Sequence, residues 1–128
     1  MPTALELTRA GWQPYIEAAR QRLVPPQPTA REKQQREQLL VRVRQVAAIL
    51  KTRFGAQRII LFGSLAEADW FTPDSDVDLA VAGLAPDVYW QAWRMAEEII
   101  HDRPVDLIEI ETARASLVQA IQKYGLEL

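Results

Sequence analysis

The sequence contains no cysteine and only one histidine among its 128 residues. The absence of cysteine excludes a disulfide framework and any zinc site built on thiolates, and it suits the reducing cytoplasm, where we expect this protein. Long apolar runs are missing too, because the longest, Val46 to Leu50, is far too short to span a bilayer. The first residues lack the basic and apolar segments of a signal peptide, so we expect neither secretion nor membrane insertion.

The formal net charge of −2 conceals an uneven distribution along the chain. Residues 1–58 hold 11 Lys or Arg and 4 Asp or Glu, whereas residues 59–128 hold 4 and 13. One interpretation is a solvated basic helix beside an acidic domain. The other is that the acidic half binds cations while the basic half faces an anionic partner. We do not expect direct nucleic-acid binding, because the basic segment has no interleaved aromatic residues and the total charge is negative.

The proline cluster "PPQP" divides the chain into two parts. Before it, residues 3–23 carry an apolar helical stripe, so residues 1–28 are predicted to be a helical extension and a stiff linker. This extension either packs back on the core or docks on a partner, and the linker favours docking. Residues 29–128 are predicted to form one domain, which is long enough to bury a core.

Within that domain, helical and strand patterns alternate. Thr29 and Glu32 have the spacing of a capping box, which predicts the start of a helix over 30–53. The pattern predicts an α/β or α+β fold, a small mixed sheet with helices packed against it. The further predicted elements are strands at 58–62, 76–81 and 105–110, a helix from Pro86 to about Asp102, and a helix from Thr112, its expected cap, to Tyr124.

Two acids interrupt the apolar residues of the second predicted strand, "DVDLAV". Side chains alternate across a strand, so Asp76 and Asp78 point to one face, about 7 Å apart. Partly buried carboxylates this close repel each other and need a counter-charge. An all-oxygen site without His or Cys favours Mg²⁺ or Mn²⁺ over zinc.

Asp106 repeats this arrangement in "VDLIEI". If its strand lies beside the second strand, three carboxylates converge and form a site for two divalent cations, the usual clamp for displacement at phosphorus. A single acid at a strand end commonly serves as a cap or turn former, but the combination of Asp76, Asp78 and Asp106 favours the metal site.

Gly63 and Ser64 follow the first predicted strand and open a helix-like segment. Glycine lets a phosphate approach the backbone closely, and the serine hydroxyl and nearby N–H groups can donate to phosphate oxygens. Tyr89, Trp90 and Trp93 open a later helix, and we expect the two tryptophans to be core residues, with adenine stacking as the alternative. A catalytic role for His101 is not favoured, since a histidine near a helix C-terminus is favourable in itself.

The segment "GSLAEADWFTPDSDVDLAV" resembles the nucleotidyltransferase motif of the polymerase-beta superfamily. It is most similar to the minimal nucleotidyltransferase (MNT) group, in which Gly-Ser, a short helix and a Pro-Asp-Ser turn precede Asp-x-Asp-Leu, with a third Asp on a later strand. The resemblance covers about residues 35–128. It implies that Gly63 and Ser64 hold the nucleotide, that Asp76 and Asp78 bind both Mg²⁺ ions, and that Asp106 completes one metal site and helps to deprotonate the acceptor.

Many MNT proteins are antitoxins of HEPN-domain ribonucleases, so the resemblance implies a Mg²⁺-dependent transfer of AMP from ATP to a tyrosine of such a toxin. The alternatives are an antitoxin that neutralises by binding alone and a nucleotidyltransferase for a small molecule such as an aminoglycoside. The family often has Arg-Gly where this sequence has Glu67 and Ala68, which removes a cation near the triphosphate. The gap from Gly63 to Asp76 is also one residue longer than usual.

Overall fold

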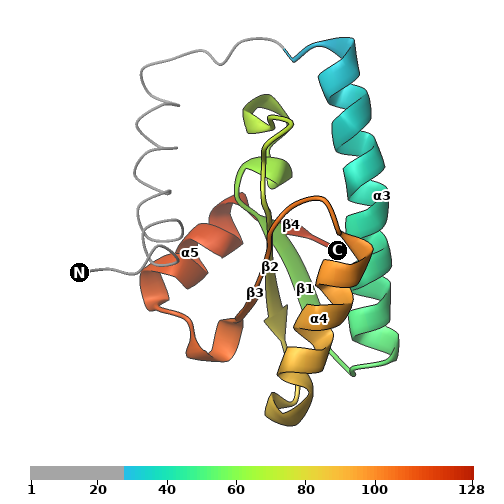
Figure 1. The fold of residues 1–128 in the computed structure, drawn as a ribbon. Coiled ribbons are helices and arrows are strands. Elements are labelled where there is room, and N and C mark those ends of the chain that lie inside the picture. The colour runs from blue at the N-terminus through green and yellow to red at the C-terminus, as the bar shows by residue number, and fades with distance from the viewer. Residues whose placement is uncertain (1–27) are drawn as a thin grey trace, which may run out of the picture.

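The computed structural model describes residues 28–128 (Figure 1). The predicted helical extension at 3–23 and its proposed docking therefore lie outside the described residues. No helix in the described part of the chain combines the length and the apolar character that a membrane crossing requires.

A long helix, α3 (Ala30–Thr52), opens the described part of the chain. The Glu32 N–H donates to the Thr29 hydroxyl oxygen at 3.1 Å, and the Thr29 N–H donates to the Glu32 carboxylate at 3.2 Å. These reciprocal hydrogen bonds confirm the predicted capping box. The buried residues recur every three or four positions, as on one face of a helix, and are Leu39, Leu40, Val43, Val46, Ala47 and Leu50.

Four strands form one mixed sheet in the order β3-β2-β1-β4. Strand β1 pairs antiparallel with β2 and with β4, whereas β2 and β3 run parallel. The mixed sheet with its packed helices confirms the predicted fold class. The bounds are β1 Arg58–Phe62, β2 Val77–Ala82, β3 Val105–Glu109 and β4 Leu126–Glu127.

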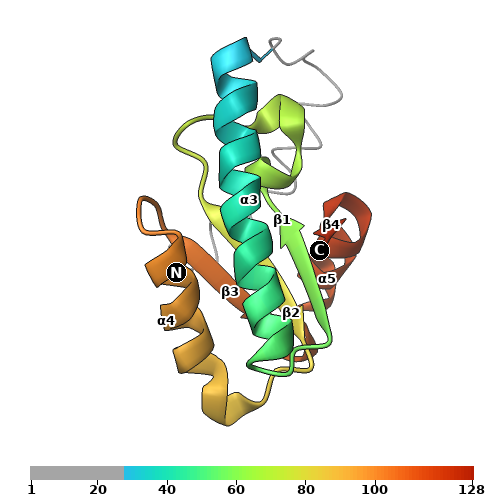
Figure 2. The ribbon, with the colours of Figure 1, turned by 90° about the vertical axis from the view of Figure 1, so that its right-hand side faces the viewer.

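Helices cover both faces of the sheet (Figure 2). Helices α3 and α4 (Tyr89–Ile99) pack on one face, where they bury residues such as Leu61, Leu79 and Leu107 in the main core. Helix α5 (Ala115–Tyr124) covers part of the other face, where Ile121 meets a smaller apolar cluster. This cluster comprises Ile60, Phe62, Ala80, Ile108 and Ile121.

Several predicted boundaries were wrong in detail, and the second strand begins at Val77 rather than at Asp76. The segment from Pro86 begins as a 3₁₀ turn (Pro86–Val88), and α4 ends at Ile99 rather than at Asp102. Thr112 is not the cap of the last helix, because it ends another 3₁₀ turn and α5 begins at Ala115. Strand β4 was missed, because two residues carry no readable alternation, and only their pairing with β1 identifies them as a strand.

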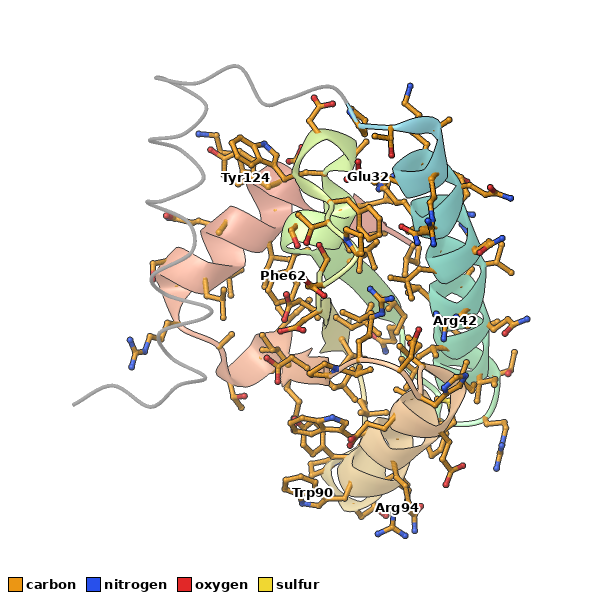
Figure 3. The ribbon with its side chains drawn as sticks, turned by 45° about the horizontal axis from the view of Figure 1, so that its top comes forward. Glu32, Arg42, Phe62, Trp90, Arg94 and Tyr124 are labelled. Atoms are coloured by element: carbon orange, nitrogen blue, oxygen red, sulfur yellow. The ribbon has the colours of Figure 1, made fainter. Side chains whose placement is uncertain are left out.

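Two aromatic side chains of α4 hydrogen-bond to the outer edge of β3. The Trp93 indole N–H donates to the Val105 carbonyl at 2.7 Å, and the Tyr89 hydroxyl donates to the Leu107 carbonyl. Strand β3 lies at the end of the sheet, so these donors replace a neighbouring strand. Trp90 is not a core residue as predicted, because it is 70% exposed and stacks flat on Trp93 (Figure 3).

Replacing Trp93 by Phe should destabilise the fold by about 1–2 kcal/mol, because the Val105 carbonyl loses its donor at the sheet edge. Trp90→Phe is the matched control and should change stability by less than about 0.5 kcal/mol, as for other exposed positions. Urea unfolding followed by circular dichroism measures both. Equal losses for the two variants would show that the indole hydrogen bond does not stabilise β3.

Candidate active site

The parallel pairing of β2 with β3 places two of the predicted acids side by side. In this register Asp78 is the direct neighbour of Asp106, and adjacent strands lie about 4.8 Å apart. Both side chains belong to the sheet face of Ala80 and Ile108, two residues further along their strands. Asp76 lies one residue before β2 and two residues before Asp78, and the three acids are called the acidic row below.

The pKa of Asp76 indicates that its carboxyl group lies near Asp106. Withdrawal of its carboxyl from water raises the pKa of Asp76, the charge of Asp106 raises it further, and the charge of Arg103 opposes both effects. Asp76 and Asp106 therefore sense each other although 30 residues separate them in the sequence. As a residue Asp76 is exposed, which leaves this end of the row open to solvent.

Gly63 and Asp78 are in close contact. Asp78 is only 4% exposed, and it lies opposite Phe62, the last residue of β1. Gly63 follows with φ +80°, and a Cβ atom added to it would lie 2.5 Å from the Asp78 Oδ2 atom. The turn thus requires glycine for its backbone conformation and for space, and it leaves a backbone surface beside a buried carboxylate.

Ser64 lies in a network of hydroxyl groups. Its hydroxyl donates to the Ser75 hydroxyl oxygen at 2.8 Å, and Ser75 Oγ also accepts the Thr72 N–H at 2.9 Å. Ser75 is buried and directly precedes Asp76. The hydrogen bond from Ser64 therefore connects the turn after β1 to the turn before β2, which are the two predicted parts of the nucleotide site.

Arg36 of α3 is a site-supporting residue that the sequence analysis did not single out. Its guanidinium donates to the Leu65 carbonyl at 3.0 Å and to the Ala66 carbonyl at 3.3 Å. It thereby fixes the 3₁₀ turn Ser64–Ala66 against α3. No local signal identifies it, because the contact joins residues about 30 positions apart and a lone arginine on a helix is usually solvated.

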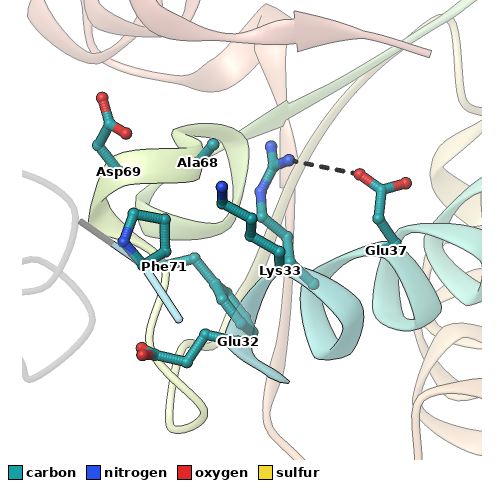
Figure 4. A pocket seen from close by; sticks show the side chains of 8 residues that line it. Glu32, Lys33, Glu37, Ala68, Asp69 and Phe71 are labelled. Carbon is teal, nitrogen blue, oxygen red and sulfur yellow. Dashed lines mark ion pairs between the residues drawn. The ribbon is translucent and has the colours of Figure 1, made fainter. Parts of the chain in front are cut away.

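A pocket of about 430 Å³ lies between α3 and the turns that follow Gly63 (Figure 4). None of the three aspartates lines it, so it is separate from the acidic row. Its lining residues are Pro28, Glu32, Lys33, Arg36, Glu37, Ala68, Asp69 and Phe71.

The acidic row consists of carboxylates, the ligand type that suits a hard divalent cation. Carboxylate oxygens are the preferred ligands of Mg²⁺, and the contact of Gly63 with Asp78 shows that no Cβ atom obstructs that carboxylate. Within residues 28–128, no three acidic or histidine side chains are grouped so that they could hold a metal ion. The β2–β3 register brings Asp78 and Asp106 to neighbouring positions, and the metal site itself stays a prediction.

A mixed sheet with Gly-Ser after its first strand and acids on the next two strands defines a class of nucleotidyltransferases. The sequence matches the family described as "Polymerase beta, Nucleotidyltransferase" over residues 44–128, about two thirds of the chain. The chain therefore belongs to the polymerase-beta nucleotidyltransferase family. No curated protein sequence matches it significantly.

Solved structures with the same fold include toxin–antitoxin complexes. A structure described as a minimal nucleotidyltransferase is 28% identical with a TM-score of 0.61, over 73% of this chain and 95% of that chain. A mutant of the toxin–antitoxin MntA-HpeT is 27% identical with a TM-score of 0.56, over 67% and 70%. A toxin–antitoxin crystallised with AMP-PNP is 25% identical with a TM-score of 0.54, over 65% and 69%.

Gly63→Ala should destabilise the protein and weaken ATP binding, because the new methyl group displaces the Asp78 carboxylate. Gly55→Ala is the matched control, since Gly55 has φ +72° but nothing within 4 Å of an added Cβ. It should lose only the backbone strain, about 1–2 kcal/mol. Urea unfolding and calorimetry with ATP and Mg²⁺ measure the two effects. Indistinguishable variants would show that the contact between Gly63 and Asp78 has no consequence.

Asp76→Asn should raise the melting temperature of the metal-free protein at pH 7. The pKa of Asp76 is raised in the folded state, so its ionised form opposes folding above that pKa. The difference between variant and wild type should disappear as the pH falls below the ordinary value of 3.8, where both folded and unfolded Asp76 are protonated. Asp74→Asn, an exposed acid on the same turn, is the control. A variant that melts at or below the wild-type temperature at pH 7 contradicts this prediction.

Proposed function

We propose that this chain is a Mg²⁺-dependent protein adenylyltransferase that transfers AMP from ATP to a tyrosine of a HEPN ribonuclease toxin and so acts as its antitoxin. The observation that carries the proposal is the register of β2 and β3, which sets Asp78 beside Asp106 next to the turn at Gly63. Membership of the nucleotidyltransferase family supports group transfer from a nucleotide. The solved toxin–antitoxin with AMP-PNP, an ATP analogue, supports ATP as co-substrate and a toxin as partner.

In the proposed reaction the tyrosine oxygen attacks the α-phosphorus of ATP. The new bond joins that oxygen to phosphorus, the bond to pyrophosphate breaks, and pyrophosphate leaves. Two Mg²⁺ ions, when bound, supply the positive charge that the attacking and leaving oxygens need. Asp76 and Asp78 would hold both ions, and Asp106 would complete one of the two sites and assist removal of the tyrosine proton.

The remaining predicted residues would orient the nucleotide. Gly63 brings its backbone close to the acidic row, so a phosphate can approach there without meeting a side chain. The Ser64 hydroxyl would exchange its hydrogen bond with Ser75 for one to a phosphate oxygen. Residues 29–128 would form the catalytic domain, and residues 1–28 a helical extension available for docking on the toxin. ATP as co-substrate agrees with a cytoplasmic protein.

The proposal predicts that incubation with α-labelled ATP, Mg²⁺ and the product of the adjacent gene labels that partner. Asp76→Asn combined with Asp78→Asn should abolish the label, because the metal ions lose two shared ligands. Asp74→Asn is the matched control and should leave labelling unchanged, since this acid is exposed on the preceding turn. Mass spectrometry identifies the modified residue, which we expect to be a tyrosine.

The other functions give different results in the same experiment. An antitoxin that acts by binding alone would neutralise the partner without label, and the double Asp variant would still neutralise it. A nucleotidyltransferase for small molecules would leave the partner unlabelled and confer aminoglycoside resistance on expression. Either result would overturn the proposal.

A further inference from the structure

Arg103 contacts the turn that leads into β2. Its Nη1 atom donates to the Ser75 carbonyl at 2.9 Å and to the Pro73 carbonyl at 3.2 Å. Only 16% of its side chain is exposed, so these hydrogen bonds are largely shielded from water. One guanidinium nitrogen therefore holds both ends of the Pro73–Ser75 segment, immediately before Asp76.

The residue after Arg103 completes this contact on the other side of Asp76. The Val77 N–H donates to the Pro104 carbonyl at 3.1 Å. Asp76 thus lies between Ser75, held by Arg103, and Val77, held by Pro104. Because Asp76 precedes β2, this local arrangement, rather than the strand ladder, determines where its carboxylate lies.

The same connection also leads into the strand of the third acid. Arg103 is three residues before Asp106, and β3 begins at Val105. A displacement of Arg103 would therefore alter the position of Asp76 relative to Asp106, two residues that belong to different strands.

Arg103 is itself oriented by an ion pair. Its Nε atom lies 3.4 Å from Asp102 Oδ1. Asp102 in turn accepts two hydrogen bonds from Arg42 of α3, at 3.0 and 3.1 Å, which hold the pKa of its carboxyl well below its usual range. These hydrogen bonds of Arg42 end on Asp102, whereas Arg103 also donates to the turn before β2.

We propose that Arg103 is a positioning residue for the metal ligands, because it fixes the backbone of the Pro73–Ser75 turn and thereby the place of Asp76 beside Asp106. This inference rests on the proposed role of the three aspartates as metal ligands and does not depend on the identity of the acceptor. The positive charge of Arg103 would by itself repel a cation. Its contribution to metal binding therefore comes from the two hydrogen bonds that fix the Pro73–Ser75 turn.

The test is Mn²⁺ binding, followed by electron paramagnetic resonance and calorimetry on the full chain without nucleotide. Arg103→Met should weaken Mn²⁺ binding about tenfold, as expected when the support of metal ligands is removed. Loss of the positive charge by itself would strengthen Mn²⁺ binding. The direction of the change therefore distinguishes the loss of the hydrogen bonds to the turn from the loss of the charge. Arg103→Lys keeps the charge and one flexible donor, and it should show a smaller loss.

Arg42→Met is the matched control, because it removes a charge from the same network but no contact to the turn. It should lower the melting temperature and weaken Mn²⁺ binding much less than Arg103→Met does, because the hydrogen bonds of Arg103 to the Ser75 and Pro73 carbonyl groups remain. Unchanged or tighter Mn²⁺ binding by Arg103→Met, or by Arg103→Lys if the Met variant does not fold, would overturn the inference. If wild type binds Mn²⁺ no better than the double variant of Asp76 and Asp78 to Asn, the site itself is wrong; if it binds and Arg103 has no effect, only this inference fails.

Discussion

The parallel pairing of β2 with β3 is the interaction on which the site depends. It places Asp78 beside Asp106 on one sheet face, at the end where β1 gives way to Gly63. The repulsion between these neighbouring carboxylates opposes the pairing. The apolar residues that follow them on each strand, such as Leu79 and Leu107, are buried on the opposite face and compensate for it. The main core thus stabilises an arrangement that the repulsion between its acidic residues disfavours.

Support for this pairing comes from segments that lie outside the sheet. Tyr89 and Trp93 satisfy carbonyl groups on either side of Asp106, so the edge strand is held by α4 as well as by β2. Arg36 fixes the turn after Gly63 in a similar way, by donating to two of its carbonyl groups. In each case a helix side chain donates a hydrogen bond to a backbone carbonyl group that no neighbouring strand pairs. These hydrogen bonds hold the segments around the acids in place without a further strand.

Sequence patterns predicted those parts of the structure that depend on local chemistry. The Thr29–Glu32 box, the apolar face of α3 and the three longer strands follow from spacing, although the second strand begins at Val77 and leaves Asp76 outside it. The contacts of Arg36 and Arg103 could not be predicted, because each joins segments about 30 residues apart and an arginine carries no signal of its partner. The prediction that Trp90 is a core residue was wrong. Helical spacing cannot distinguish a buried tryptophan from an exposed one that stacks on a neighbouring tryptophan.

Glu67 and Ala68 directly follow the 3₁₀ turn Ser64–Ala66. The resemblance to the MNT motif implies Arg-Gly where this chain has Glu67 and Ala68. The guanidinium of Arg36 on α3 is already hydrogen-bonded to the carbonyl groups of Leu65 and Ala66. Lys33 is exposed one helical turn earlier and lines the same pocket as Arg36 and Asp69. Any compensation for the missing charge near a bound triphosphate therefore has to come from the metal ions, from a rearrangement of α3 side chains, or from a partner. The carboxylates of β2 and β3 supply no positive charge to a triphosphate, so under the proposed function the nucleotide affinity of this chain should depend strongly on Mg²⁺.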